Sequence, residues 1–350
     1  MSLPGGVYNV SYGQDMAIIR TNLQRGWFIA FLVLLCLAPF FTSNYITSII
    51  IILAINIIAV QGLNILTGYC GQLSIGHAAF VGVGAYTSAI LTTKLVWSFW
   101  LALPCAGFAA GIIGLIFGLP SLKVKGLYLA MATLAAQFII YYVMVHATGL
   151  TGGAEGIVTR APRLGDIVIN TPKSFYYIAI PMCILFTFFA KNLVRTRTGR
   201  AFIAIRDNDL AAEVMGINLY YHKILAFFIG CFYAGIAGAL WAHYTRVATP
   251  EAYTLHVSVW YLGMLIIGGM GSTLGAILGT VFIKVMQELI IVYGPSISAA
   301  FPFIGGQVVS SMGAILFGFL LIVFLVFEPR GLAHRWELLK NSYRLMPFSY

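Results

Sequence analysis

Few ionisable residues lie inside the apolar stretches of this chain, and they are the first candidates for chemistry. Lys284 and Glu288 are four residues apart in one such stretch, so on a helix they share a face where they could relay a proton or neutralise each other. We favour mutual neutralisation, or extension of Lys284 toward the edge of the stretch. His77 opens another stretch without a second histidine or carboxylate at ligand spacing, so we favour a hydrogen-bonded structural histidine over a metal ligand.

Charge is concentrated in residues 195–222, between two apolar stretches. Charged residues are only 9% of the chain, yet seven of them fall within nineteen positions: Arg195, Arg197, Arg200, Arg206, Asp207, Asp209 and Glu213. We interpret this segment as the place where the protein meets an aqueous partner. The alternative is a solvated connector that keeps positive charge on one side of a membrane.

The common catalytic signatures do not occur in the sequence. It contains no G-x-S-x-G, no HExxH, no CxxC pair and no G-x-x-x-x-G-K-[ST] phosphate loop. We therefore predict that the chain is not an enzyme and binds no metal or cofactor itself. If it does work driven by ATP, another chain must bind the nucleotide.

Composition places the chain in a lipid bilayer. Hydrophobic residues make up 60% of the 350 positions, too many for a soluble surface, so we predict an all-α polytopic membrane protein with about ten transmembrane helices. A ruler of about 20 residues per span gives these ranges: 27–42, 45–66, 77–95, 98–119, 126–147, 174–194, 223–243, 255–270, 274–294 and 311–327. The basic residues stand at the ends of these ranges and form no stripe, so a nucleic-acid partner is not expected.

An even number of spans puts both termini on one side, and the positive charges indicate which. Fourteen lysines and arginines fall on the side of the termini and five on the other, so the termini are predicted to be cytoplasmic. The expected organisation is a cytoplasmic segment 1–26, a transmembrane domain 27–327 with a cytoplasmic loop at 195–222, and a cytoplasmic tail 328–350.

Glycines recur at the four-residue spacing that lets helices approach closely. Gly271, Gly275 and Gly279 form one such set, which we interpret as a packing face. The Gly-rich stretches 67–80 and 268–275 allow two readings, plain turns or unwound backbone within the membrane, and we favour turns.

Six stretches resemble a known family in order along the chain, over about residues 60–332. They are GLNILTGYCGQLSIGHAAFVGVGAYTSAIL (62–91), LTGGAEGI (150–157), GRAFIAIRDNDLAAEVMGIN (199–218), KILAFFIGCFYAGIAGALWAHY (223–244), IIGGMGSTLGAILG (266–279) and EPRGL (328–332). Together they closely resemble the inner-membrane permease subunits of branched-chain amino acid ABC transporters, in particular the extended permease of high-affinity leucine, isoleucine and valine uptake systems.

The resemblance implies a multi-pass protein of the bacterial inner membrane and a set of partners. In this family a second homologous permease completes the pore, two separate ATP-binding cassette ATPase subunits use the ATP, and a periplasmic amino-acid-binding protein delivers the substrate. Related permeases serve urea and short amides, so such an importer is the alternative within the family. A secondary transporter or channel is the alternative from another class.

The resemblance also suggests residue roles. In ABC importers the loop that contacts the ATPase carries an E-A-A-x-x-x-G motif. Here Ala211, Ala212 and Gly216 match it, whereas Leu210 replaces the leading glutamate and the later I-x-L-P part is absent. The expected coupling residues are Gly199, Arg200, Asp209, Ala211, Ala212, Glu213 and Gly216.

We expect the coupling loop to form a short helix that Asp207 and Asp209 cap, and that Gly216 ends in a left-handed conformation. The two alanines would let this helix sit close in a partner's groove. For the translocation path or its gates we expect Gly71, Gly76, His77, Thr151, Gly152 and Gly153.

Overall fold

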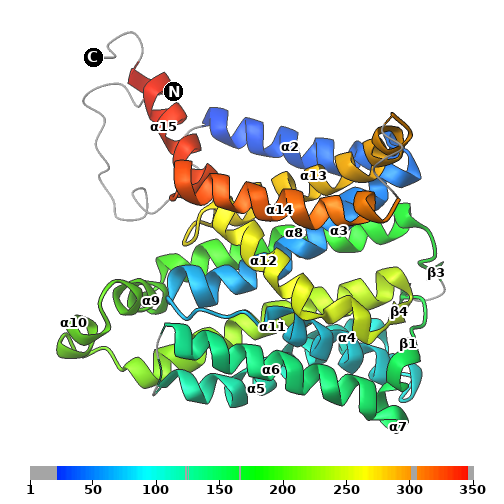
Figure 1. Cartoon of the computed structure of the whole chain (residues 1–350), viewed down its shortest axis with the longest axis horizontal. Helices are drawn as coiled ribbons and strands as arrows, with labels where there is room; N and C mark the ends of the chain where they lie inside the picture. The colour runs from blue at the N-terminus through cyan, green and yellow to red at the C-terminus, as the bar shows by residue number, and fades with distance from the viewer. Residues whose placement is uncertain (1–21, 123, 125, 165–166, 301–305, 346–350) are drawn as a thin grey trace.

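The computed structural model describes residues 22–122, 124, 126–164, 167–300 and 306–345, which form an almost entirely helical protein (Figure 1). Ten of its helices overlap the ten predicted ranges. They are α2 (Asn22–Phe41), α3 (Asn44–Leu63), α4 (His77–Thr93), α5 (Phe99–Gly118), α6 (Leu127–His146), α8 (Pro172–Arg195), α11 (Leu219–Thr245), α12 (Leu255–Gly268), α13 (Thr273–Ala300) and α14 (Gly306–Phe327). The predicted all-α fold is confirmed.

Short elements connect these helices. The helical ones are a π-helix η1 (Asn64–Tyr69), the 3-10 helices η2 (Leu119–Leu122), η3 (Gly153–Glu155) and η4 (Pro250–Tyr253), and the α-helices α7 (Thr148–Thr151), α9 (Arg197–Asp207), α10 (Asp209–Val214) and α15 (Gly331–Leu345). Two short antiparallel pairs join β1 (Ile157–Val158) to β4 (Val247–Ala248) and β2 (Arg163–Leu164) to β3 (Ile167–Val168).

Not every helix is long enough to cross a bilayer by itself. Within the described residues, six helices are long and apolar enough, and a seventh span results if α14 and α15, which bend by 49° at a short break, count as one. Helices α4 and α12 have 17 and 14 residues, whereas a span needs about 20. The structure therefore contains six or seven candidate spans.

Helix α11 lies in the core and packs against α3, α4 and α5. The contacts with α4 join main chain to main chain, since a methyl group on Gly84 would overlap Gly235 and one on Gly238 would overlap the carbonyl of Val81. On α5 a row of glycines faces α11 side chains: Gly107, Gly111, Gly114 and Gly118. Small residues allow these helices to approach so closely.

Two of the three glycines expected to form a packing face lie in the contact between α12 and α13. Gly275 and Gly279 hold α13 against α12, because a methyl group on them would overlap the main chain at Gly268 and Met264. Gly271 lies before α13, in the turn after α12, and has a φ of 78°. Its inclusion in a helix face was wrong, because its backbone is left-handed rather than helical.

The two Gly-rich stretches differ. Residues 269–272 form a four-residue turn between α12 and α13, so the expected turn is confirmed there. In the other stretch, α3 continues as the π-helix η1 and is followed by an irregular, mostly buried segment, residues 70–76. The expectation of a plain turn was wrong for this stretch, because its backbone is unwound and is buried by the surrounding helices.

The connections gather at two ends of the helical bundle (Figure 1). Helices α9 and α10 project at one end, whereas α7 and the pair β1–β4 lie at the opposite end. Segments 195–222 and 148–173, predicted to face opposite sides of a membrane, are thus far apart. Most of the predicted N-terminal segment 1–26 lies outside the described residues.

Candidate functional site

The charged segment begins with α9, an amphipathic helix. The side chain of Thr196 caps its start by accepting a hydrogen bond from the amide of Gly199, 3.3 Å away. Gly199 is buried where a methyl group would overlap the carbonyl of Leu193, so it lets α9 fold back against α8. Arg200 is exposed and donates to the carbonyl of Arg195 at 3.0 Å.

Helix α10 follows directly and is delimited at both ends. The side chain of Asn208 caps it by accepting from the amide of Ala211 at 3.1 Å. The expectation that Asp207 and Asp209 cap this helix was wrong, because their carboxylates bind Arg206 and Lys223 instead. Gly216 has a φ of 84°, which confirms the left-handed end of the helix.

The two faces of α10 differ in their contacts. Ala212 is buried against the rest of the chain, whereas Ala211 and Glu213 are exposed. An inward-facing Ala212 cannot also enter a partner's groove, so the expected role of the two alanines does not hold for it. Instead the outward surface includes three large apolar side chains. Leu210 is 68%, Val214 88% and Met215 82% exposed.

Sequence reasoning missed these three residues as candidates. They recur at positions four and five apart within the most charged segment of the chain. On a short helix that spacing places Leu210 and Val214 on one side. This spacing indicates an apolar side of the helix, whereas the E-A-A-x-x-x-G motif points to the small residues between Leu210 and Val214.

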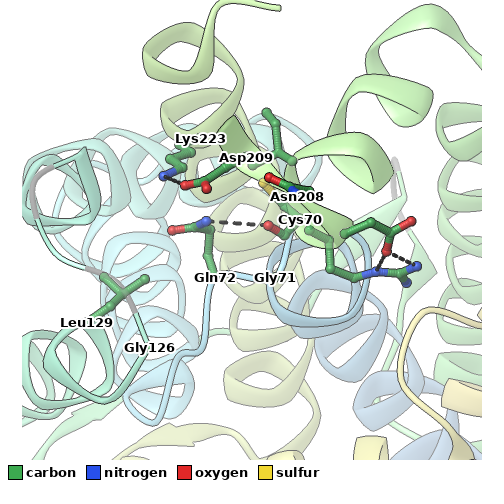
Figure 2. A pocket seen from close by; sticks show the side chains of 11 residues that line it. Cys70, Gly71, Gln72, Gly126, Leu129, Asn208, Asp209 and Lys223 are labelled. Atoms are coloured by element: carbon green, nitrogen blue, oxygen red, sulfur yellow. Dashed lines mark hydrogen bonds and ion pairs between the residues drawn. The ribbon is translucent and has the colours of Figure 1, made fainter. Parts of the chain in front are cut away.

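A polar pocket lies beneath the charged segment (Figure 2). Its volume is about 320 Å³, and its wall includes the ion pair of Lys223 with Asp209, 3.6 Å apart, and the ion pair of Arg206 with Asp207, 2.8 Å apart. The irregular segment 70–76 forms another part of the wall, through Cys70, Gly71 and Gln72. Gly71, predicted for the translocation path, therefore meets the predicted coupling segment in this pocket.

Gly76 and His77 lie deeper, in the core. A methyl group on Gly76 would overlap the carbonyl of Thr133, so this glycine lets α6 approach the irregular segment. His77 is fully buried, with its Nε2 2.9 Å from the carbonyl oxygen of Ala59 and its ring edge-on to Tyr261. The predicted structural, hydrogen-bonded histidine is confirmed.

Thr151, Gly152 and Gly153 are at the other end of the bundle, where Thr151 ends α7 and the two glycines follow it. The hydroxyl of Thr151 donates to the carbonyl of Met144 at 2.8 Å and accepts from the amide of Gly153 at 3.2 Å. Gly152 and Gly153 have φ values of 75° and 65°, so they form a tight left-handed turn. The structure does not bring this turn together with Gly71.

The remaining pair of intramembrane charges has a neighbour that the sequence did not reveal. Glu288 accepts a hydrogen bond of 2.8 Å from the hydroxyl of Tyr45 at the start of α3. Neutralisation of Lys284 by Glu288 stays a prediction.

This arrangement defines a multi-pass membrane protein that presents a short, delimited helix at one end of its bundle. A sequence model of the family described as branched-chain amino acid transport system, permease component, matches residues 45–325. The chain belongs to this family, and it is the permease component of a branched-chain amino acid ABC importer. The family comprises the permease and not the ATP-hydrolysing component, so the chain is not itself an enzyme.

Relatives support this assignment over most of the chain. The high-affinity branched-chain amino acid transport system permease protein LivM of Escherichia coli is 30% identical over 89% of this chain and 75% of its own length. A probable LivM of Methanocaldococcus jannaschii is 28% identical over 66% and 67%, and the ribose import permease protein RbsC of Haemophilus influenzae is 23% identical over 78% and 87%. No solved structure matches the chain.

Family membership decides against the secondary transporter or channel that composition alone allowed. It also places the chain among multi-pass membrane permeases such as those of the bacterial inner membrane.

Proposed function

We propose that this permease forms one half of a pore, that a second homologous permease forms the other half, and that two ATPase subunits drive it. ATP is used by those subunits, and this chain binds no cofactor. A periplasmic amino-acid-binding protein delivers the substrate to the outer face. The proposal is supported by the family and by the LivM relatives, whose names describe the permease protein of a transport system.

The proposed topology has ten membrane helices, both termini in the cytoplasm and a transmembrane domain over 27–327. It is supported by the ten helices in the ten predicted ranges and by the opposite positions of segments 148–173 and 195–222 (Figure 1). The short helices α4 and α12 would cross only part of the bilayer. Unwound backbone is tolerated at membrane depth where protein covers it, as it covers most of residues 70–76.

One observation carries the proposed coupling to the ATPases: the exposed apolar surface of α10. Leu210, Val214 and Met215 expose most of their surface on a helix at the charged end of the chain, where water would otherwise cover them. Exposed apolar side chains on a short helix are typical of a surface that docks into a groove. We therefore assign α10 and Gly216 to the contact with an ATPase subunit.

A charge placed on this surface tests the assignment. In the Val214→Asp variant, the ATPase subunits should no longer co-purify with the permease, since the docked carboxylate would lose its water. Val158→Asp is the matched control, because Val158 is 74% exposed at the opposite end of the bundle. Equal recovery of ATPase with both variants would refute the assignment.

For the substrate path we propose Gly71, Gly76 and His77 in the interior and the turn of Thr151, Gly152 and Gly153 at the outer face, either as a gate or as a contact for the binding protein. The proposed cargo is leucine, isoleucine and valine, with urea or a short amide as the alternative. A ligand screen of the cognate binding protein, followed by uptake of the labelled hit, distinguishes these substrates.

A further inference from the structure

The last turn of α9 contacts the place where α3 and η1 stop. Nη1 of Arg206 donates a hydrogen bond of 3.1 Å to the carbonyl oxygen of Gly68, which lies 138 residues earlier in the chain and next to the end of η1. The charged segment at the edge of the bundle is thereby joined to the most buried of its candidate spans.

This hydrogen bond gives a partner to a carbonyl group at the place where the helix breaks. The last carbonyls of a helix have no partner within it, and they carry a partial negative charge that favours a cation. Because the chain becomes irregular after Tyr69, the carbonyl of Gly68 is one of these groups, and Arg206 supplies the cation. Single-turn π-helices like η1 are rare in proteins, and those that occur often lie at functional sites.

Two glycines make room for the Arg206 side chain. A Cβ on Gly71 would lie 3.0 Å from Cγ of Arg206, and a Cβ on Gly271 would lie 2.7 Å from its Nη1. Both glycines have positive φ, in the irregular segment and in the α12–α13 turn respectively. The guanidinium is oriented by Asp207, whose Oδ1 accepts from Nε at 2.9 Å.

The α12–α13 turn is attached to the same π-helix through its first residue, Asn64. Oδ1 of Asn64 accepts from the amide of Gly271 at 2.9 Å, and its Nδ2 donates to the carbonyl of Ser272 at 3.0 Å. Arg206 therefore lies where α9, the end of η1 and this turn meet.

We propose that Arg206 is a positioning residue that couples the ATPase contact on α10 to the break between η1 and α4. The proposal rests on the proposed role of α10. Arg206 is separated from that helix only by the end of α9 and Asn208. In the conformation described here, the guanidinium caps η1 and holds segment 70–76 in place. A displacement of α9 by the ATPases withdraws that cap and frees the segment, which contains Gly71 and Gly76 and directly precedes His77.

The test uses the complete importer in lipid nanodiscs and compares Arg206→Gln, Arg206→Lys and Arg197→Gln. Arg197 is an exposed arginine on the same helix, so its variant removes the same charge without touching Gly68. Hydrogen exchange of the peptides that cover 64–76 reports on the cap, and stimulation of ATP hydrolysis by loaded binding protein reports on coupling. Co-purification of the ATPases checks that the complex is intact.

Arg206→Gln should speed exchange in 64–76 on the order of tenfold, because a charge-assisted hydrogen bond is lost. It should also abolish the stimulation of hydrolysis, and Arg197→Gln should do neither. Arg206→Lys keeps the cation, so we expect intermediate exchange and partial rescue of stimulation. The lysine variant carries the test if the glutamine variant does not assemble.

The proposal would be overturned if an assembled Arg206→Gln variant kept the hydrogen exchange and the stimulation of ATP hydrolysis of the unsubstituted complex. It would also be overturned if Arg197→Gln changed both as much as Arg206→Gln does. Failure of the proposed function is a separate result. In that case Val214→Asp itself would leave ATPase binding intact.

Discussion

The ammonium of Lys223 lies 3.6 Å from the carboxylate of Asp209, and this ion pair joins the first residue of α10 to the start of α11 (Figure 2). The Lys223 side chain is 4% exposed and that of Asp209 19%, so the lysine is the more buried partner. Since α11 packs against three other helices in the core, the pair connects the proposed ATPase contact to the core of the molecule.

Removing the carboxylate of Asp209 should therefore lower the free energy of unfolding more than removing the ammonium of Lys223. Asp209→Ala leaves a buried ammonium without its counter-charge, and we expect a loss of about 1–3 kcal/mol in the free energy of unfolding. Lys223→Met replaces the buried cation by an apolar chain of similar length and should cost less, because Asp209 is reached by water. Thermal unfolding of the two purified variants measures the difference, with Glu213→Ala on the exposed face of α10 as the control. Equal melting temperatures for Asp209→Ala and the control would contradict this expectation.

Gly216→Val should uncouple ATP hydrolysis from transport. A β-branched residue resists the φ of 84° at this position, so the end of α10 would be forced into another conformation. Gly216→Asn is the matched control, because asparagine tolerates positive φ and a Cβ here meets no atom within 4 Å. We expect the valine variant to lose the stimulation of hydrolysis by loaded binding protein and the asparagine variant to keep most of it. If both variants keep it, the conformation of Gly216 is unimportant for coupling.

The proposed topology predicts that two exposed glutamates, Glu155 and Glu213, face opposite sides of the membrane. Single cysteines at these positions, in a background without the native cysteines, should react with an impermeant thiol reagent from opposite faces. Intact cells should label position 155, and inverted vesicles should label position 213. Labelling of both from one side would be incompatible with the ten-span arrangement.

An added methyl group should destabilise the protein at Gly279 but not at Gly318. In Gly279→Ala the new methyl group would overlap the carbonyl of Met264, so α12 and α13 must separate, at a cost of about 1–3 kcal/mol. Gly318 on α14 has no atom within 4 Å of an added Cβ, so alanine there should leave stability unchanged or raise it slightly. Thermal unfolding in detergent measures both, and a melting temperature for Gly279→Ala at or above that of Gly318→Ala would contradict the packing described.

The sequence predicted what depends on neighbouring residues along the chain. The ten helix ranges follow from the length of the apolar stretches, and the left-handed end of α10 follows from a single glycine, Gly216. The π-helix at 64–69 could not be predicted in this way. Its end is stabilised by Arg206, and its approach to the α12–α13 turn depends on Asn64, so both contacts join residues far apart in the chain.

The start of α10 shows the same limitation at short range. Asp207, Asn208 and Asp209 are all good capping residues, and the sequence does not rank them. The choice falls on Asn208 because Arg206 and Lys223 occupy the carboxylates on either side. Which side of α10 faces outward is likewise decided by the burial of Ala212 beneath it.

The glycine contacts of α4 and α5 with α11 constrain how the protein can rearrange during a transport cycle. Where main chain touches main chain, as at Gly84 with Gly235 and at Gly238 with Val81, no side chain can change rotamer to accommodate sliding. These three helices must then move as one rigid block, as must α12 with α13 through Gly279 and Met264. By the same criterion α3 belongs to the block of α11, since a Cβ on Gly62 would lie 2.6 Å from the carbonyl oxygen of Gly230. Relative displacement then falls to the seam where α3 and α4 meet α12 and α13.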